Sequence, residues 1–310
     1  MKENVLITGV DGFKGAHLTK KLLEKYNVVG LMHDHRPITT LTLLGLDNKI
    51  TKIYGDICDR DLIKRILADY NIKRVFHLAA QAIVSVALKD PLTTFKVNCL
   101  GTATLLDACR DLNLTSINVI STDKTYGEGM ERKETDVLDS RGIYETSKAA
   151  MDYIGRSFFY VYGLPVIVTR ACNTYGEYDL NKRIVPNTIL ALKSNEQPII
   201  FRGEKSIREY VYVDDVSDAY ITLSEHINRT KGEIFNVGSG SVISQEDLVK
   251  KIIEISGKRV EPKYLEKSKD LFEIFQQTVN TEKIRNMIGW KPKFDLNMGL
   301  KRTWDNWRII

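Results

Sequence analysis

Short apolar runs alternate with longer amphipathic stretches through the first half of the chain. The apolar runs are rich in Val and Ile and almost continuous in apolarity, as strands buried on both faces require. We expect strands at residues 4–9, 27–32, 50–55, 74–80, 116–122 and 165–170, and helices at residues 14–25, 59–70, 92–112 and 145–162. Because strand–helix alternation builds βαβ units, the pattern predicts an α/β fold with a Rossmann-type, doubly wound parallel sheet.

The rhythm changes after residue 170. Helices are expected at residues 183–196 and 216–228, a short strand at 210–215, and an amphipathic helix at 244–257. In the last of these, Ser244 can cap the first turn and Gly257 can end the helix. The sequence has no linker rich in Pro, Gly or Ser between the two parts. We therefore expect residues 171–310 to form mainly a smaller α/β lobe that packs on the first part.

Composition and charge limit the partners that the chain is expected to have. Among 310 residues, 45 Lys and Arg face 40 Asp and Glu, and the net charge of +5 is scattered rather than gathered in a block. This distribution does not indicate a nucleic-acid partner. No stretch approaches the ~18 apolar residues of a membrane helix, and we expect no signal peptide. The four cysteines form no C-x-x-C pair and the five histidines have no metal-ligand spacing, so we expect no metal and a cytoplasmic location.

A glycine triplet opens the first predicted helix. Gly9, Gly12 and Gly15 follow the first predicted strand in the segment LITGVDGFKG. Glycines at this place let the backbone turn tightly and approach a pyrophosphate, which the N–H groups at the helix start can bind. The triplet therefore predicts that residues 1–170, with return segments around 208–236, form an NAD(P)-binding domain, and that residues 171–310 mainly bind the substrate.

The end of the second predicted strand bears on the choice of dinucleotide. Asp34 lies roughly 20 residues beyond the last glycine, where an acid accepts hydrogen bonds from the adenosine ribose. This position favours NAD over NADP. His33 and Arg36 flank Asp34, however, and either could meet a 2′-phosphate, so the sequence leaves NADP as the alternative.

A tyrosine and a lysine four residues apart provide candidate chemistry. Tyr144 and Lys148 lie at the start of a predicted helix, where this spacing places both on one face. A lysine ammonium near a phenol favours the phenolate, which is a base. Ser121 and Thr122 end a predicted strand and carry hydroxyl groups that could orient a substrate. Together with the glycine loop, these residues predict a hydride-transfer site.

These motifs resemble the extended short-chain dehydrogenase/reductases that act on nucleotide sugars, and the resemblance covers nearly the whole chain. TGVDGFKG, GDI (55–57), HLAAQ (77–81) and YETSK are similar to the family's cofactor and catalytic segments. RACNTYG (170–176), REYVYVDD (208–215) and IGWKP (288–292) resemble its later signatures. The resemblance implies NAD as the cofactor and a nucleoside-diphosphate sugar as the substrate.

The resemblance also implies particular site residues. For the cofactor these are Gly9, Gly12, Phe13, Gly15, Asp34, Asp56, Ile57, Leu78, Ala79, Ala80, Asn98, Tyr144 and Lys148. For the substrate they are Gln81, Ser121, Asn173, Arg183 and Arg208, with Asn173 on the phosphates and Arg208 on the diphosphate.

The segment STDKTYGE (121–128) separates two reactions of this family. A 4-epimerase oxidises and reduces one carbon, whereas a 4,6-dehydratase also needs a base for the C5 proton and an acid for the departing C6 hydroxyl. Asp123 and Lys124 supply such a pair, and Thr-Asp-Lys looks like the segment of CDP-glucose 4,6-dehydratases. By that resemblance Thr122 holds the 4-hydroxyl, Asp123 is the acid and Lys124 the candidate base. The leading hypothesis is therefore a nucleotide-sugar 4,6-dehydratase.

Two other functions stay open at this stage. One is an NAD-dependent nucleotide-sugar 4-epimerase, against which Asp123 and Lys124 argue. The other is a non-catalytic dinucleotide sensor, which has no need of a base such as Tyr144. The helices expected at 92–112 and 145–162 correspond to the pair through which the family dimerises, so the resemblance implies a homodimer.

Overall fold

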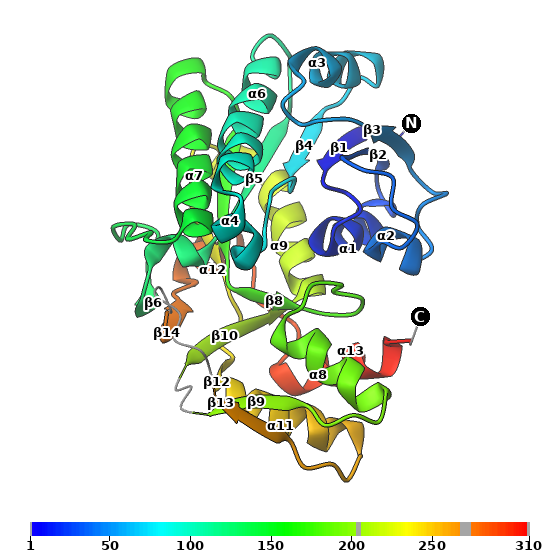
Figure 1. The fold of residues 1–310 in the computed structure, drawn as a ribbon. Coiled ribbons are helices and arrows are strands. Elements are labelled where there is room, and N and C mark those ends of the chain that lie inside the picture. Colours follow the sequence, from blue (N-terminus) through cyan, green and yellow to red (C-terminus); the bar gives the residue numbers. More distant parts are fainter. Residues whose placement is uncertain (1, 203–205, 267–273, 309–310) are drawn as a thin grey trace.

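The computed structural model describes residues 2–202, 206–266 and 274–308. Its largest element is a seven-stranded sheet in the order β11-β7-β5-β4-β1-β2-β3, shown in the upper part of Figure 1. Every neighbouring pair in this sheet is parallel. The strands are β1 (Asn4–Thr8), β2 (Asn27–Met32), β3 (Thr51–Tyr54), β4 (Arg74–His77), β5 (Ser116–Thr122), β7 (Val166–Ala171) and β11 (Ile234–Val237).

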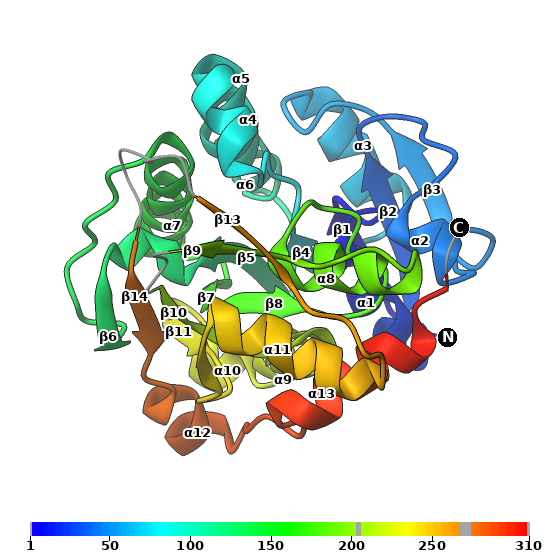
Figure 2. The same cartoon turned by 60° about the horizontal axis from the view of Figure 1, so that its bottom comes forward.

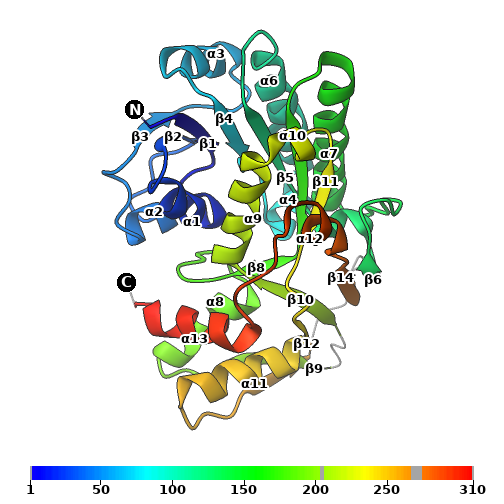
Figure 3. The same ribbon diagram turned by 180° about the vertical axis from the view of Figure 1, so that it is seen from behind.

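Helices cover both faces of the large sheet. In β1, Val5 and Ile7 pack in the core with α1 (Phe13–Leu22), α2 (Thr40–Leu43) and α9 (Val213–Glu225). Leu6 points to the other face, where it packs with α3 (Arg60–Asp69), α6 (Gly101–Ala108) and α7 (Ile143–Tyr162). Figure 3 shows α9 beside α1 on the first face. Alternate residues of a strand point to opposite faces, so the uninterrupted apolar runs fit a doubly wound sheet, as predicted.

The helix expected at residues 92–112 forms over residues 91–108, with a π turn in its middle and a separate short helix before it. The chain forms α4 (Val84–Lys89), α5 (Pro91–Phe95), a π-helical turn η1 (Lys96–Leu100) and then α6. Asp90 caps α5 by accepting a hydrogen bond from the Thr93 N–H, and Pro91 occupies its first turn. At the π turn, buried Asn98 bonds to a loop outside the helix, a tertiary contact that apolar periodicity does not register. The helix prediction is therefore confirmed over residues 92–108, whereas residues 109–112 are not helical and the π turn was not predicted.

The smaller lobe is built on β10 (Ile207–Tyr212). This strand pairs with β8 (Asn173–Tyr175), β12 (Val242–Ser244) and β14 (Gln276–Val279), and β14 pairs with β6 (Gly129–Arg132). A separate pair joins β9 (Ile199–Arg202) to β13 (Lys263–Glu266). The helices of the lobe are α8 (Ile184–Lys193), α11 (Gln245–Ser256) and α13 (Leu296–Asn306), which lie together in Figure 2. Two short helices, α10 (Ile227–Thr230) and α12 (Glu282–Ile288), lie beside β11.

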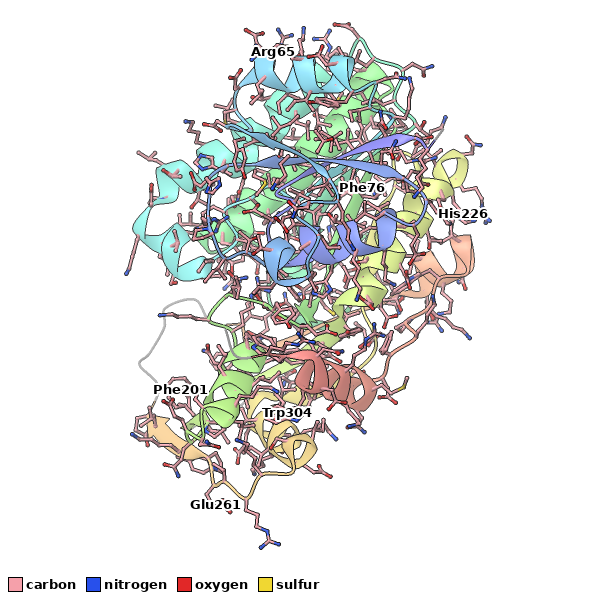
Figure 4. All side chains as sticks on the ribbon, turned by 90° about the vertical axis from the view of Figure 1, so that its right-hand side faces the viewer. Arg65, Phe76, Phe201, His226, Glu261 and Trp304 are labelled. Atoms are coloured by element: carbon pink, nitrogen blue, oxygen red, sulfur yellow. The ribbon has the colours of Figure 1, made fainter. Side chains whose placement is uncertain are left out.

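A third apolar cluster joins the lobe to the large sheet. Ile189 of α8, Leu248 of α11 and Leu300 of α13 pack in one cluster with Phe13 from the start of α1. In Figure 4, Phe76 lies within the large sheet, while Phe201 and Trp304 lie in the lobe below it. The start of α1 is thus held between the two parts. In the described part of the chain, no helix is both long and apolar enough to cross a membrane.

Candidate active site

The predicted site residues meet at the carboxyl ends of the central strands. The glycine loop follows β1, residues 78–81 follow β4, and the 3-10 turn η2 (Asp123–Tyr126) follows β5. Because β1, β4 and β5 are parallel neighbours, these three segments end at the same edge of the sheet. Figure 1 shows that this edge faces the smaller lobe. Ligands of open α/β sheets bind at such an edge.

The glycine loop has the form that a pyrophosphate requires. Gly9 adopts φ = +71°, and a Cβ there would come 2.9 Å from the backbone nitrogen of Ala79. A Cβ at Gly15 would collide with the carbonyl oxygen of Gly9. At the N-cap of α1, Gly12 has no side chain to bond the first N–H groups. These N–H groups can therefore donate to phosphate oxygens, so the loop fits the diphosphate of a dinucleotide.

The expected ribose end of the site carries a hydrogen-bonded His–Asp contact and an Arg–Asp ion pair. Asp34 is exposed and pairs with His33 at 2.8 Å. Arg36 donates to Asp11 of the glycine loop at 2.9 Å, and the Asp11 side chain is buried. Arg36 is therefore engaged by an acid of this loop rather than left as an unpaired cation.

Asp56 and Ile57 lie at the end of β3 in different surroundings. Asp56 accepts a hydrogen bond from the Cys58 N–H at 2.9 Å, which lowers the pKa of its carboxyl. Its second oxygen lies 3.4 Å from the Lys96 ammonium. Ile57 is buried and packs against Gly101 of α6. The structure thus places an ionised, partly exposed acid beside an apolar core residue.

Asn98 fastens the loop after β4 to the helix that carries the tyrosine. Its side chain accepts from the Gln81 N–H at 2.7 Å and donates to the Gln81 carbonyl at 3.0 Å. The same amide donates to Ser147 Oγ at 2.8 Å, and Ser147 Oγ donates to the carbonyl of Tyr144. A π turn at such a place is frequent in functional sites. The turn η1 therefore connects the Gln81 loop with α7.

The strand before this loop is fixed by a buried histidine. His77 lies between Thr8 Oγ1 at 2.8 Å and Thr102 Oγ1 at 2.9 Å. Burial lowers the pKa of His77 to about 3, so the ring is neutral. Thr8 Oγ1 also accepts from the Ala79 N–H at 3.1 Å. Leu78 and Ala79 are partly buried and pack against opposite core clusters, with Ala80 following them.

Tyr144 and Lys148 are both buried on the first turns of α7. The Lys148 ammonium donates to the carbonyl of Ile120 at 2.7 Å, which ties the helix to β5. Burial, with the nearby charge of Lys14, lowers the pKa of Lys148 to about 7. Burial raises the pKa of Tyr144 to about 12, against the opposing charge of Arg183 and a hydrogen bond with Thr122. The hydroxyl of Thr122 thus lies against the phenol.

The turn η2 carries a buried acid and a partly buried lysine. Thr122 Oγ1 donates to Asp123 Oδ1 at 3.0 Å. Asp123 Oδ2 is buried and has no hydrogen-bond partner among the described residues. Burial raises the pKa of Asp123 and lowers that of Lys124, while each charge opposes the shift of the other. Both effects favour the neutral forms, which is the arrangement that general acid–base chemistry uses.

Contacts from the rest of the fold fix this turn. Gln277 of β14 donates to the carbonyls of Asp123 at 3.0 Å and Gly127 at 3.1 Å. Tyr126 donates to Asn236 at 2.8 Å, and the Arg170 guanidinium lies over its ring at 4.6 Å. Both lobes therefore hold Asp123 and Lys124 in place.

The residues expected to meet the substrate come from both parts of the fold: Ser121 lies in β5 of the large sheet, and the others lie in the smaller lobe and the segment leading into it. Asn173 donates to the carbonyl of Glu209 at 3.1 Å. Arg208 is buried, donates to the carbonyls of Ile207 and Ile274, and acts electrostatically on Asp123 and Lys124. Arg183 pairs with Asp179 at 3.6 Å and acts on Tyr144. Ser121 donates to the carbonyl of Lys148 at 3.2 Å.

Several residues of the site were missed by sequence reasoning. Lys14 lies one position before Gly15, inside the glycine motif, and its charge acts on both Asp123 and Lys148. Asp179 lies four residues before Arg183, a spacing that signals an ion pair. Asp152 lies four residues beyond Lys148 and pairs with buried Arg170 at 2.7 Å.

Within the described residues no group of three or more His, Cys, Asp or Glu side chains could hold a metal ion. The arrangement instead offers a phosphate loop, a buried tyrosine–lysine pair and a buried acid–lysine pair. These groups can take up and release protons beside a bound dinucleotide.

Comparison with known proteins places the chain among enzymes. The family model described as GDP-mannose 4,6 dehydratase matches residues 6–303. A human dTDP-D-glucose 4,6-dehydratase is 27% identical over 99% of this chain and 93% of its own length. The Dictyostelium discoideum dTDP-D-glucose 4,6-dehydratase is 33% identical over 82% of this chain and 62% of its own.

Solved structures share the fold over the same span. A Bacillus cereus UDP-glucuronic acid 4-epimerase, crystallised with UDP-glucuronic acid and NAD, is similar with a TM-score of 0.88 and 26% identity. The alignment covers 98% of each chain.

Proposed function

The chain belongs to the GDP-mannose 4,6-dehydratase family, and on that premise we propose that it is an NAD-dependent nucleotide-sugar 4,6-dehydratase. Its reaction converts a nucleoside-diphosphate hexose into the 4-keto-6-deoxyhexose. The dTDP-glucose 4,6-dehydratases among its relatives support the reaction. NAD in the similar epimerase structure supports the cofactor. The glycine loop fits that cofactor, because Gly9 and Gly15 lie so close to neighbouring backbone atoms that a side chain at either position would collide with them.

One observation carries the choice of reaction. Asp123 and Lys124 lie in a turn that is fixed at the end of β5, next to Thr122 and within electrostatic reach of Tyr144. A 4-epimerase needs no acid or base beyond the tyrosine, whereas elimination of water needs both. Asp123 is buried, and one of its carboxyl oxygens has no hydrogen-bond partner among the described residues. A buried polar atom without a partner lowers the stability of the fold, and a catalytic role for the carboxyl explains why it is there.

The roles follow from the positions. When bound at the glycine loop, NAD would supply a hydride acceptor for C4 and a hydride donor for C6. Tyr144 takes the proton of the 4-hydroxyl, which Thr122 orients, and Lys148 fixes the helix through Ile120. Lys124 removes the C5 proton, which the C4 ketone makes acidic, and Asp123 gives its proton to the C6 hydroxyl as that group leaves as water. Protonated Lys124, whose proton exchanges with solvent, then returns a proton to C5 as C6 gains its hydride, and the proton taken up by Tyr144 restores the acid form of Asp123. Burial, which lowers the pKa of Lys124 and raises that of Asp123, prepares the neutral base and the protonated acid.

We propose CDP-glucose as the substrate to test first. In this proposal Arg183, Arg208 and Asn173 bind its diphosphate. The support is the sequence resemblance of Thr122-Asp123-Lys124 to the CDP-glucose 4,6-dehydratases. The relatives act on dTDP-glucose, which makes that nucleotide the principal rival. NAD is preferred over NADP because Arg36 is paired with Asp11.

A product assay tests the reaction class. Purified protein is incubated with CDP-, dTDP-, UDP- and GDP-hexoses, and products are followed by mass spectrometry. Loss of one water supports the proposal, whereas an isomer of the substrate supports the 4-epimerase. Asp123→Asn and Lys124→Ala are expected to lose most turnover, by the ~10²-fold or more that general acid–base groups contribute. Exposed Lys20→Ala serves as the matched control.

We also propose a homodimer formed through α7 and the α4–α6 region. Large apolar side chains are exposed there, among them Val84, Leu88, Leu92, Leu100, Tyr153 and Tyr160. Figure 2 shows α4 and α5 projecting from the body of the molecule. Exposed large apolar side chains on neighbouring helices support an interaction site there. Sedimentation at micromolar concentration should give twice the chain mass, and Leu92→Glu with Leu100→Glu should give the monomer.

A cytoplasmic location is proposed because the four cysteines are free thiols, which suits a reducing compartment. Cell fractionation tests this placement.

A further inference from the structure

An acid inside the glycine loop is paired with an arginine from the connection after β2. Asp11 lies between Gly9 and Gly12, and its side chain is only 4% exposed. Its carboxyl accepts a hydrogen bond from the Arg36 guanidinium at 2.9 Å, and Arg36 is the one hydrogen-bond partner of this carboxyl among the described residues. The Arg36 side chain is 59% exposed. The pair therefore joins the loop after β1 to the loop after β2.

The backbone brings the same two loops together. β1 and β2 are parallel neighbours (Figure 1), and the Gly9 N–H donates to the carbonyl of Leu31 at 2.9 Å. Asp34, the acid expected at the adenosine ribose, follows the last residue of β2 by two positions. The phosphate loop, the expected ribose acid and the pair of Arg36 with Asp11 therefore share one end of the sheet.

A carboxylate is an unexpected group to bury in a loop that fits phosphates. Like charges repel, so an unpaired Asp11 would weaken the binding of the diphosphate that NAD and NADP share. Arg36 neutralises this charge.

The pairing also engages the guanidinium, whose planar set of N–H donors otherwise suits a phosphate. His33, which flanks Asp34 on its other side, is engaged in the same way, because its ring lies 2.8 Å from the Asp34 carboxyl. A 2′-phosphate beside Asp34 would therefore meet an exposed carboxylate, while both flanking cation candidates already have acidic partners.

We propose that Asp11 is a positioning residue for cofactor specificity: by engaging Arg36 on the glycine loop, it favours NAD, whose ribose has a free 2′-hydroxyl, over NADP. The inference rests on the dinucleotide cofactor of the proposed function, and it names the residue that decides between the two forms of that cofactor. It holds for a dehydratase and for an epimerase alike, because it concerns the cofactor and not the sugar.

Dinucleotide binding to the protein without substrate tests the proposal. Calorimetry gives the Kd of NAD and of NADP for each variant, and the ratio of the two constants is compared. In Asp11→Asn the released guanidinium should strengthen the binding of NADP relative to NAD by roughly tenfold or more, as a hydrogen bond to a charged group contributes. A general fault in the loop would instead weaken both dinucleotides and leave the ratio unchanged. Asp11→Glu keeps a carboxylate for Arg36 and should keep the ratio.

Two further variants separate the guanidinium from the loop. In Asp11→Asn/Arg36→Met no guanidinium is available, so the ratio should return toward that of the unchanged protein. Glu225→Gln is the matched control, because the ion pair of Glu225 with Lys25 lies beyond the opposite end of α1, and its ratio should not move. An unchanged ratio in Asp11→Asn, or an equal shift in the double variant, would overturn the proposal.

Failure of this inference and failure of the proposed function give different results. If the ratio shifts as expected while the product assay shows no loss of water, only the proposed reaction is refuted. If water is lost while the ratio does not move, only the role of Asp11 is refuted.

Discussion

Breaking the buried ion pair between Arg170 and Asp152 should destabilise the protein strongly. Arg170 is 1% exposed and Asp152 fully buried, and they meet at 2.7 Å. Asp152→Asn leaves the guanidinium without its counter-ion in a region closed to water. Removing one partner of such a pair costs about 3–5 kcal/mol of the free energy of unfolding. The pair also joins α7 to β7, and the Arg170 guanidinium lies over the ring of Tyr126 in η2.

The assay is urea unfolding followed by circular dichroism, with the slope against urea compared between variants. Asp305→Asn is the matched control, because the exposed pair of Asp305 with Lys301 contributes at most about 1 kcal/mol. The double variant Asp152→Leu/Arg170→Met should lose less than the sum of the two single losses, since neither charge is left alone. A loss below about 1 kcal/mol for Asp152→Asn would refute the reasoning.

Three further predictions concern the loop, the buried histidine and the π turn. Gly15→Ala should abolish NAD binding measured by calorimetry, because its Cβ collides with the Gly9 carbonyl, whereas exposed Gly163→Ala should leave binding unchanged. His77 has a folded pKa of about 3, below the ~6.5 of the unfolded chain, so the unfolded state binds more protons between those values. Its contribution is therefore complete above pH ~6.5 and falls by up to ~1.4 kcal/mol per pH unit on acidification, a slope that His77→Asn should reduce. Asn98→Ala removes the side chain that bonds the N–H and the carbonyl of Gln81. The free energy of unfolding should fall by about 1–3 kcal/mol, which thermal unfolding can measure. Unchanged stability would contradict the role of Asn98 in fastening the Gln81 loop.

Much of the fold was predictable because burial on both faces leaves continuous apolar runs in the sequence. The strand predictions at 116–122 and 27–32 match β5 and β2. The cap at Ser244 was also correct: its Oγ accepts from the Asp247 N–H at 3.0 Å, and Gly257 ends the helix with φ = +67°. These features depend on neighbouring residues, so the local sequence contains them.

Features that depend on distant partners were not predictable in the same way. The π turn at Asn98 requires the Gln81 loop, and the strands of the smaller lobe, such as β8 and β12, have three residues each. Such segments are too short for a hydrophobic period. The electrostatic effect of Lys14 on Asp123 depends on tertiary packing, although the position of Lys14 in the glycine motif was visible. The roles given to Asp123 and Lys124 stay predictions.

The central claim is tested most directly with CDP-glucose carrying deuterium at C4, and with dTDP-glucose labelled in the same way. We expect a product lighter by one water that keeps the deuterium, now at C6, with a solvent hydrogen at C5. Asp123→Asn should slow its formation. An isomer of the substrate with the deuterium still at C4 would contradict the dehydratase and identify the protein as an epimerase.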